Sequence, residues 1–178
     1  MKKFIAIICV CLLTFGCGEK NSPTKQVEMF MGKYQTLDAE MLSDLEESIN
    51  QETNFNEEQK KTYKDIMKKH YQELTYSVKN EEIDGDKATV KVEIEVVDFS
   101  KVLEQADQAL RDNPNQFYDE TGAYNVYKFT DYRLELLKQA KEKVKYTLDL
   151  TLTKSDKKWT VNALTDTEES KLNGTYNY

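Results

Sequence analysis

The apolar residues of this chain change their spacing along the sequence, from steps of three and four to strict alternation and back. Between residues 24 and 50 they form one helical stripe from Val27 to Ile49, which predicts a single long amphipathic helix. After the polar stretch "NQETNFNEEQ", Asn56 is placed to cap a second helix with Tyr63 and Tyr71 on its apolar side. We expect these two helices to pack as an antiparallel pair.

The apolar period becomes two after about Glu73, which predicts β-strands. In "EEIDGDKATVKVEIEVVDF" the turn "DGD" separates two alternating stretches, and valines and isoleucine from Val90 to Val96 line one side. This pattern is typical of a hairpin with one buried face. A second hairpin is predicted where the alternation from Val144 to Leu152 meets the turn "KSDKK" and a strand around Trp159.

Shorter helices are predicted between and after the two hairpins. Helical spacing runs from Ser100, a possible cap, to Arg111, and again from about Tyr132 to Lys141. The tail "LTDTEESKLNG" carries a capping box and a glycine stop, which predicts a short terminal helix. The order of elements predicts an α+β fold, in which a helix pair and further helices pack on one face of a curved antiparallel sheet of about four strands.

The second hairpin, "KYTLDLTLTKSDKKWTVNAL", and the tail after it resemble the small α+β lipoproteins of Gram-positive bacteria that are described as NTF2-like or cystatin-like. The resemblance implies a curved sheet that can enclose a pocket. In this chain the first hairpin is followed by two further helices and an aromatic loop over residues 112–131. We therefore expect that the pocket typical of the fold can be filled or absent here.

The N-terminus has the layout of an export signal. Lys2 and Lys3 give a positive start, and an apolar run from Phe4 to Phe15 follows. A helix that spans a membrane needs about 20 apolar residues, so this run is too short to be one. The alternatives are a lipoprotein signal, an ordinary secretory signal and an uncleaved anchor.

The end of this segment resembles the lipobox of bacterial lipoproteins through Gly16 and Cys17, whereas Thr14 and Phe15 depart from the usual leucine and small residue. The resemblance implies cleavage before Cys17, lipidation of its thiol, and a protein held on the extracytoplasmic face of the cell membrane. We expect a signal peptide over residues 1–16, a lipid-anchored tether over 17–22 and a single α+β domain over 23–178.

Composition excludes several classes of function. The other two cysteines, Cys9 and Cys11, would leave with the signal, so no free thiol would remain. The chain carries 25 basic and 32 acidic residues, a net charge of −7, which argues against nucleic acid as a partner. His70 is the only histidine, and we interpret it as a hydrogen-bonded boundary residue. No metal site, cofactor site or catalytic set is predicted, and we expect no enzyme.

Six aromatic residues gather between residues 117 and 132, and they include Tyr118, Tyr124 and Tyr127. Tyrosines suit a protein interface or stacking on sugars, but the same rings could cover one end of the sheet as a small core. Our preferred hypothesis is an interaction module for an envelope or secreted protein. The alternatives are a pocket for a small apolar or sugar ligand, lined by Tyr146 and Trp159, and an enzyme that uses only carboxylates and tyrosines.

Overall fold

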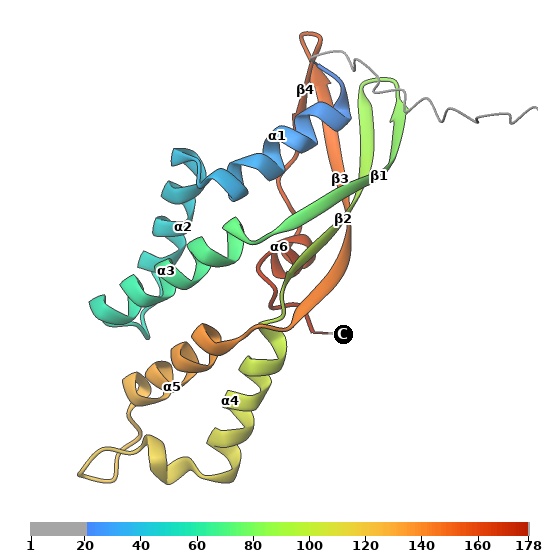
Figure 1. Ribbon diagram of the computed structural model, residues 1–178. Helices are drawn as coiled ribbons and strands as arrows, with labels where there is room; N and C mark the ends of the chain where they lie inside the picture. Colours follow the sequence, from blue (N-terminus) through green and yellow to red (C-terminus); the bar gives the residue numbers. More distant parts are fainter. Residues whose placement is uncertain (1–20, 178) are drawn as a thin grey trace, which may run out of the picture.

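A computed structural model describes residues 21–177 of the chain (Figure 1). The described residues do not include the predicted signal peptide, Cys17 or most of the predicted tether. The elements in chain order are α1 (Pro23–Thr36), α2 (Ala39–Gln51), α3 (Glu57–Gln72), β1 (Thr75–Asp84), β2 (Lys87–Val97), α4 (Ser100–Asp112), the short 3-10 helix η1 (Pro114–Phe117), α5 (Val126–Gln139), β3 (Lys143–Ser155), β4 (Lys158–Val161) and α6 (Asp166–Leu172).

The predicted long N-terminal helix is wrong, because the chain breaks it into α1 and α2 at Leu37. Leu37 takes a left-handed conformation with φ of 55°, and the N–H groups of Leu37 and Asp38 donate to the carbonyls of Tyr34 and Lys33. This is the hydrogen-bond pattern that ends a helix, usually with glycine at the left-handed position. The carboxylate of Asp38 then accepts from the N–H of Glu40 and starts α2.

The four strands form one antiparallel sheet in the order β1-β2-β3-β4. Val90 of β2 lies opposite Leu150 of β3, so the alternating apolar residues of both strands share one face, and that face is buried. Helix α1 packs across β1, β2 and β4, and α6 packs against β3. The α+β fold class and the four-stranded sheet are confirmed.

A helical hairpin, α4 and α5, is inserted between the two central strands (Figure 1). Strand β2 leads into α4, and α5 leads back into β3, so the hairpin extends beyond the end of the sheet. Helix α5 packs against α3, and α3 packs against α2. The predicted start of α5 near Tyr132 is wrong by about two turns, because the side chain of Asn125 caps the helix by accepting from the N–H groups of Tyr127 and Lys128.

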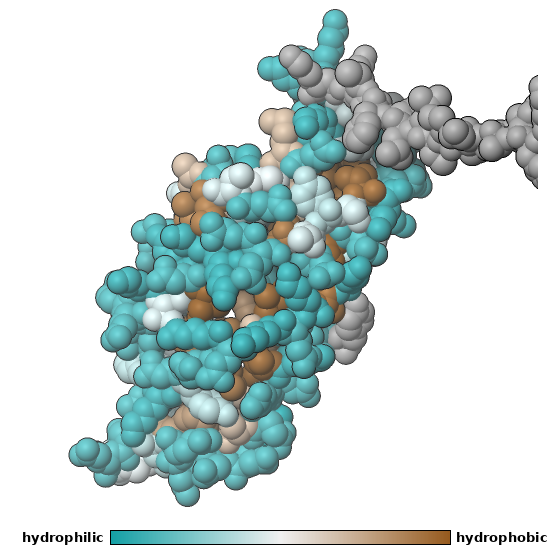
Figure 2. All heavy atoms as spheres, viewed as in Figure 1, coloured by the Kyte–Doolittle hydropathy of each residue, from teal (hydrophilic) through white to brown (hydrophobic). Residues whose placement is uncertain are grey.

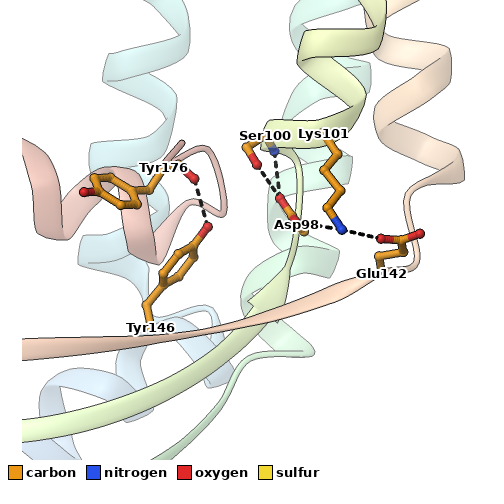
Figure 3. Close-up of polar contacts among 6 residues, drawn as sticks. All are labelled: Asp98, Ser100, Lys101, Glu142, Tyr146 and Tyr176. Atoms are coloured by element: carbon orange, nitrogen blue, oxygen red, sulfur yellow. Dashed lines mark hydrogen bonds and ion pairs between the residues drawn. The ribbon is translucent and has the colours of Figure 1, made fainter. Parts of the chain in front are cut away.

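Polar contacts hold the junction between sheet and hairpin (Figure 3). The buried carboxylate of Asp98 accepts from the N–H and the hydroxyl of Ser100, at 3.1 and 2.6 Å. The sequence suggested that Ser100 caps α4. Ser100 is instead the first residue of this helix, and its side chain does not cap it. Lys101 lies 3.8 Å from Asp98 and 2.7 Å from Glu142, which joins the start of α4 to the segment before β3.

Within the part of the chain that the structure describes, the buried residues form three clusters. The largest lies between the sheet and α1 and α6, the second lies among α2, α3, α5 and the residues that follow β2, and the smallest lies inside the tip of the α4–α5 hairpin. We call the part of the molecule built on the first cluster the sheet half, and the part built on the other two the helical half.

Candidate functional site

The tip of the α4–α5 hairpin presents tyrosines to the solvent. Tyr118 and Tyr124 face each other in an isolated antiparallel bridge, and Tyr127 lies in the first turn of α5. Tyr124 is 48% exposed and Tyr127 is 45% exposed, which places both among the most exposed large apolar side chains in the described part of the chain. The sequence pattern predicts all three tyrosines in one irregular loop, but Tyr127 belongs to α5 because that helix already begins at Val126.

The turn that joins Tyr118 to Tyr124 is held by one carboxylate. Asp119 accepts from the N–H and the hydroxyl of Thr121 and from the N–H of Ala123, at 2.7 to 3.0 Å. The Thr121 hydroxyl, followed by the Ala123 N–H, lowers the pKa of Asp119. The tyrosines are therefore displayed on an ordered turn, which reduces the entropy that binding would have to remove.

The remaining aromatic residues of this segment face inward. Phe117 packs edge-on against Phe129 with ring centroids 5.0 Å apart, and it also contacts Tyr132. The buried amide of Gln59 on α3 donates to the carbonyl of Tyr127 at 2.9 Å and to Asp131 at 2.7 Å. One set of rings therefore forms a small core inside the α4–α5 hairpin and not over an end of the sheet, and the other set lies on the surface of the hairpin.

No pocket of the expected kind opens over the inner face of the sheet. Tyr146, Leu148 and Trp159 are 3%, 1% and 7% exposed, and none of the three lines any of the larger cavities found between residues 21 and 177. Helices α1 and α6 and the C-terminal segment fill the space over this face of the sheet. The hydroxyl of Tyr146 on β3 donates to the carbonyl of Tyr176 in the C-terminal segment.

A cavity with a volume of about 380 Å³ lies instead between α3 and α5. Figure 2 shows a hollow with hydrophobic side chains at this place. Its floor is apolar and its rim carries charges of both signs. The lining residues are Thr62, Asp65, Ile66, Lys69, His70, Glu73, Val97, Phe99, Leu137, Lys138 and Ala140.

His70 is buried in the wall of this cavity, with 2% of its surface exposed, so it is not the boundary residue that the sequence suggested. Its Nε2 lies 2.9 Å from the carbonyl oxygen of Leu172, and because a carbonyl only accepts, Nε2 carries the proton. The ring stacks on Phe99 with centroids 4.7 Å apart. Nδ1 is buried without a partner in the described chain, and burial lowers the pKa of His70.

A smaller cavity of about 170 Å³ shares Phe99 and Leu137 with the first one. Arg133 of α5 lines it, together with Tyr63 of α3. The guanidinium lies 5.9 Å from the ring centroid of Phe129, and its Nε is buried without a hydrogen-bond partner among residues 21–177. Neither this arginine nor the cavity was predicted from the sequence, because both depend on how α3 and α5 diverge.

A third hollow, of about 260 Å³, lies where α1, α2, α3 and α6 meet. Burial raises the pKa of Tyr34 to about 12 and also raises the pKa of Tyr71, whose hydroxyl donates to Asn173 at 2.7 Å. Both phenols therefore stay protonated at neutral pH. Within the described part of the chain, no group of three or more His, Cys, Asp or Glu side chains is placed to hold a metal ion.

No protein-family model matches the chain, and no curated protein matches it. A solved structure with limited similarity is the crystal structure of a candidate lipoprotein (ycdA) from Bacillus subtilis subsp. subtilis str. 168, with 15% sequence identity and a TM-score of 0.42. The similarity covers 84% of this chain and 46% of the other, so this chain spans less than half of that protein's length. A similarity this low does not carry properties from one protein to the other.

Proposed function

We propose that this protein is a lipid-anchored interaction module on the extracytoplasmic face of the bacterial cell membrane, and that the tip of the α4–α5 hairpin recognises a protein partner. It performs no catalysis in this proposal. Its only activity in this proposal is to bind a protein partner at the hairpin tip, at a fixed distance from the membrane.

The anchor is supported by the sequence around Cys17, where a basic start, an apolar run and a Gly-Cys junction follow in order. Within residues 21–177, no helix combines the length and the apolar character needed to cross a bilayer. Folded structure begins soon after Cys17, since the N–H of Trp159 donates to the Asn21 side chain at 3.2 Å and Ser22 caps α1.

The observation that carries the proposal is the position of the tyrosines at the hairpin tip, of which Tyr124 and Tyr127 are exposed. Helix α1 begins at one end of the molecule, beside the β3–β4 turn, and the tip with Tyr118, Tyr124 and Tyr127 lies at the opposite end (Figure 1). A lipid attached shortly before α1 would hold the sheet half near the bilayer and direct the tip away from it. The net charge of −7 adds a general repulsion between the folded domain and an anionic membrane surface.

The anchor is tested by changing Cys17 to Ser and separating membranes from the soluble and secreted fractions. We expect the unmodified chain in the membrane fraction and the variant outside it. A variant that remained with the membranes would contradict lipidation at Cys17, whatever the tip does.

The partner surface is tested by chemical cross-linking in intact cells. A triple variant, Tyr118→Ala, Tyr124→Ala and Tyr127→Ala, is compared with the unmodified chain. A matched control changes Met29→Ala and Ile83→Ala, which are each 55% exposed and lie in the sheet half. We expect the adduct to be lost only in the triple variant. An adduct that survives in the triple variant, or one that is lost equally in the control, would contradict the proposal.

A further inference from the structure

The helical half contains a cation without an anion. Among residues 21–177, Arg133 forms no hydrogen bond and no ion pair, and its only charged neighbour in the smaller cavity is the exposed Glu52 at the end of α2. Half of the lysines in residues 21–177 have a carboxylate within 4 Å, as Lys64 and Lys101 do. An arginine left unpaired in a strongly acidic protein, with its Nε buried, is therefore available to an anion from outside.

The groups around Arg133 suit a carboxylate. A guanidinium presents N–H donors in a planar fork that matches the two oxygens of a carboxylate. Tyr63 lines the same cavity, and burial raises the pKa of its phenol, so the hydroxyl stays a donor at neutral pH. Thr130 and Thr175 are the other polar residues in the lining apart from Glu52.

The path that leads away from Arg133 is apolar. Phe99 and Leu137 line both the smaller cavity and the larger one, and Ile66 and Val97 continue the apolar lining on the α3 side. Phe99 and Val97 are 3% and 6% exposed. The larger cavity, about 380 Å³, is within the usual size range of small-molecule sites.

We propose that the two cavities form one binding site for a small anionic amphiphile, a carboxylate with an unbranched apolar chain. The carboxylate binds to the guanidinium of Arg133, and the chain lies along Phe99 and Leu137 into the hollow between α3 and α5. This site is separate from the tyrosines at the tip, so it can exist whether or not the tip binds a protein.

The experiment measures binding of octanoate and 1-octanol to the purified domain, by calorimetry or by NMR shifts. The two probes share the chain length and differ in the charged group. We expect octanoate to bind at least tenfold more tightly than 1-octanol, which corresponds to about 1.4 kcal/mol. Equal affinity for the two probes, or no measurable binding of octanoate, would overturn the proposal.

Two matched substitutions locate the charge that octanoate recognises. Arg133→Gln removes the proposed contact, and we expect it to reduce octanoate affinity to the level of 1-octanol. The control Arg111→Gln removes an exposed cation of α4 that lines neither of the two cavities, and we expect it to change octanoate affinity less than twofold. A larger loss in the Arg111 variant than in the Arg133 variant would overturn the assignment. If Arg133→Gln does not fold, the difference in affinity between octanoate and 1-octanol for the unmodified protein still tests the proposal.

Discussion

The sheet half and the helical half of this molecule differ in how completely they are packed. On the inner face of the sheet, Val90, Val92, Ile94 and their neighbours on β3 are at most 3% exposed and enclose no large cavity. In the described chain, the two buried side-chain polar atoms without a partner, Nδ1 of His70 and Nε of Arg133, belong to α3 and α5. The comparison indicates that the sheet supplies stability and that the helical half retains two cavities and the unpaired groups that binding can use.

The largest expected difference is in the cost of removing a leucine. Leu148→Ala empties a site in the packed sheet, and we expect it to lower the free energy of unfolding by about 4 kcal/mol. Leu137→Ala enlarges a cavity that already exists, so the loss should be about 2 kcal/mol. Urea denaturation of both variants measures the difference, and an equal or larger loss for Leu137 would contradict the contrast in packing.

Two glycines with positive φ allow the packing at the junction between sheet and hairpin to be compared with the packing at the hairpin tip. A Cβ at Gly174 would lie 2.1 Å from the carbonyl oxygen of Val97 and 2.9 Å from Cε1 of His70, whereas a Cβ at Gly122 would meet nothing within 4 Å. We expect Gly174→Ala to cost at least about 3 kcal/mol, and Gly122→Ala only the backbone cost of about 1 kcal/mol. Thermal denaturation compares them, and similar midpoints would show that the junction is looser than it appears.

The pH dependence of stability tests the burial of His70. Burial lowers its pKa below 6.5 in the folded protein, so between pH 6.5 and that lower value the unfolded chain binds a proton that the folded chain does not. The free energy of unfolding should therefore fall as the pH falls through this window, by at most about 1.4 kcal/mol per pH unit. Above pH 6.5 the residue is neutral in both states and contributes no pH dependence.

The control is His70→Gln, which keeps a donor for the carbonyl of Leu172 and does not titrate. Denaturation at about pH 7.5 and about pH 5.5 brackets the expected fall, since carboxylates in the unfolded chain titrate near pH 4. A fall of the same size in the glutamine variant would show that other groups cause it.

The smallest expected effect is at the β3–β4 turn in the sheet half. Asp156 and Lys157 have φ of 49° and 65°, as in the two-residue hairpin turn in which glycine is preferred at the second position. We expect Lys157→Gly to raise the free energy of unfolding by about 0.5 to 1 kcal/mol. A lower free energy of unfolding in the variant would show that the lysine side chain stabilises the protein by more than its left-handed backbone conformation costs.

The sheet half was largely predictable from the sequence because its signals are local. Alternation from Val90 to Val96 and from Val144 to Leu152 follows directly from strand geometry, and the capping box of Thr165 and Glu168 in α6 is present as predicted. The break at Leu37 was missed because the apolar spacing continues through it, and a leucine is not the residue expected in a left-handed conformation.

The helical half was less predictable because its features depend on packing between distant elements. The tyrosines at the tip could be identified by their density, but their separation from the inward-facing Phe117 and Phe129 depends on the fold of the turn. The early start of α5 at Asn125 had a local signal, an asparagine cap, that the aromatic residues around it obscured. The two cavities, one lined by His70 and the other by Arg133, arise from the angle between α3 and α5, which no sequence pattern encodes.

The central claim is that the helical half binds a partner while a lipid on Cys17 keeps the sheet half near the membrane. The most direct measurement places a photo-reactive amino acid at position 124 in one chain and at position 83 in another, and compares the proteins captured in intact cells. The account predicts a defined protein adduct at position 124 that is absent at position 83. Identical adducts at both positions, or an adduct at position 83 alone, would contradict it.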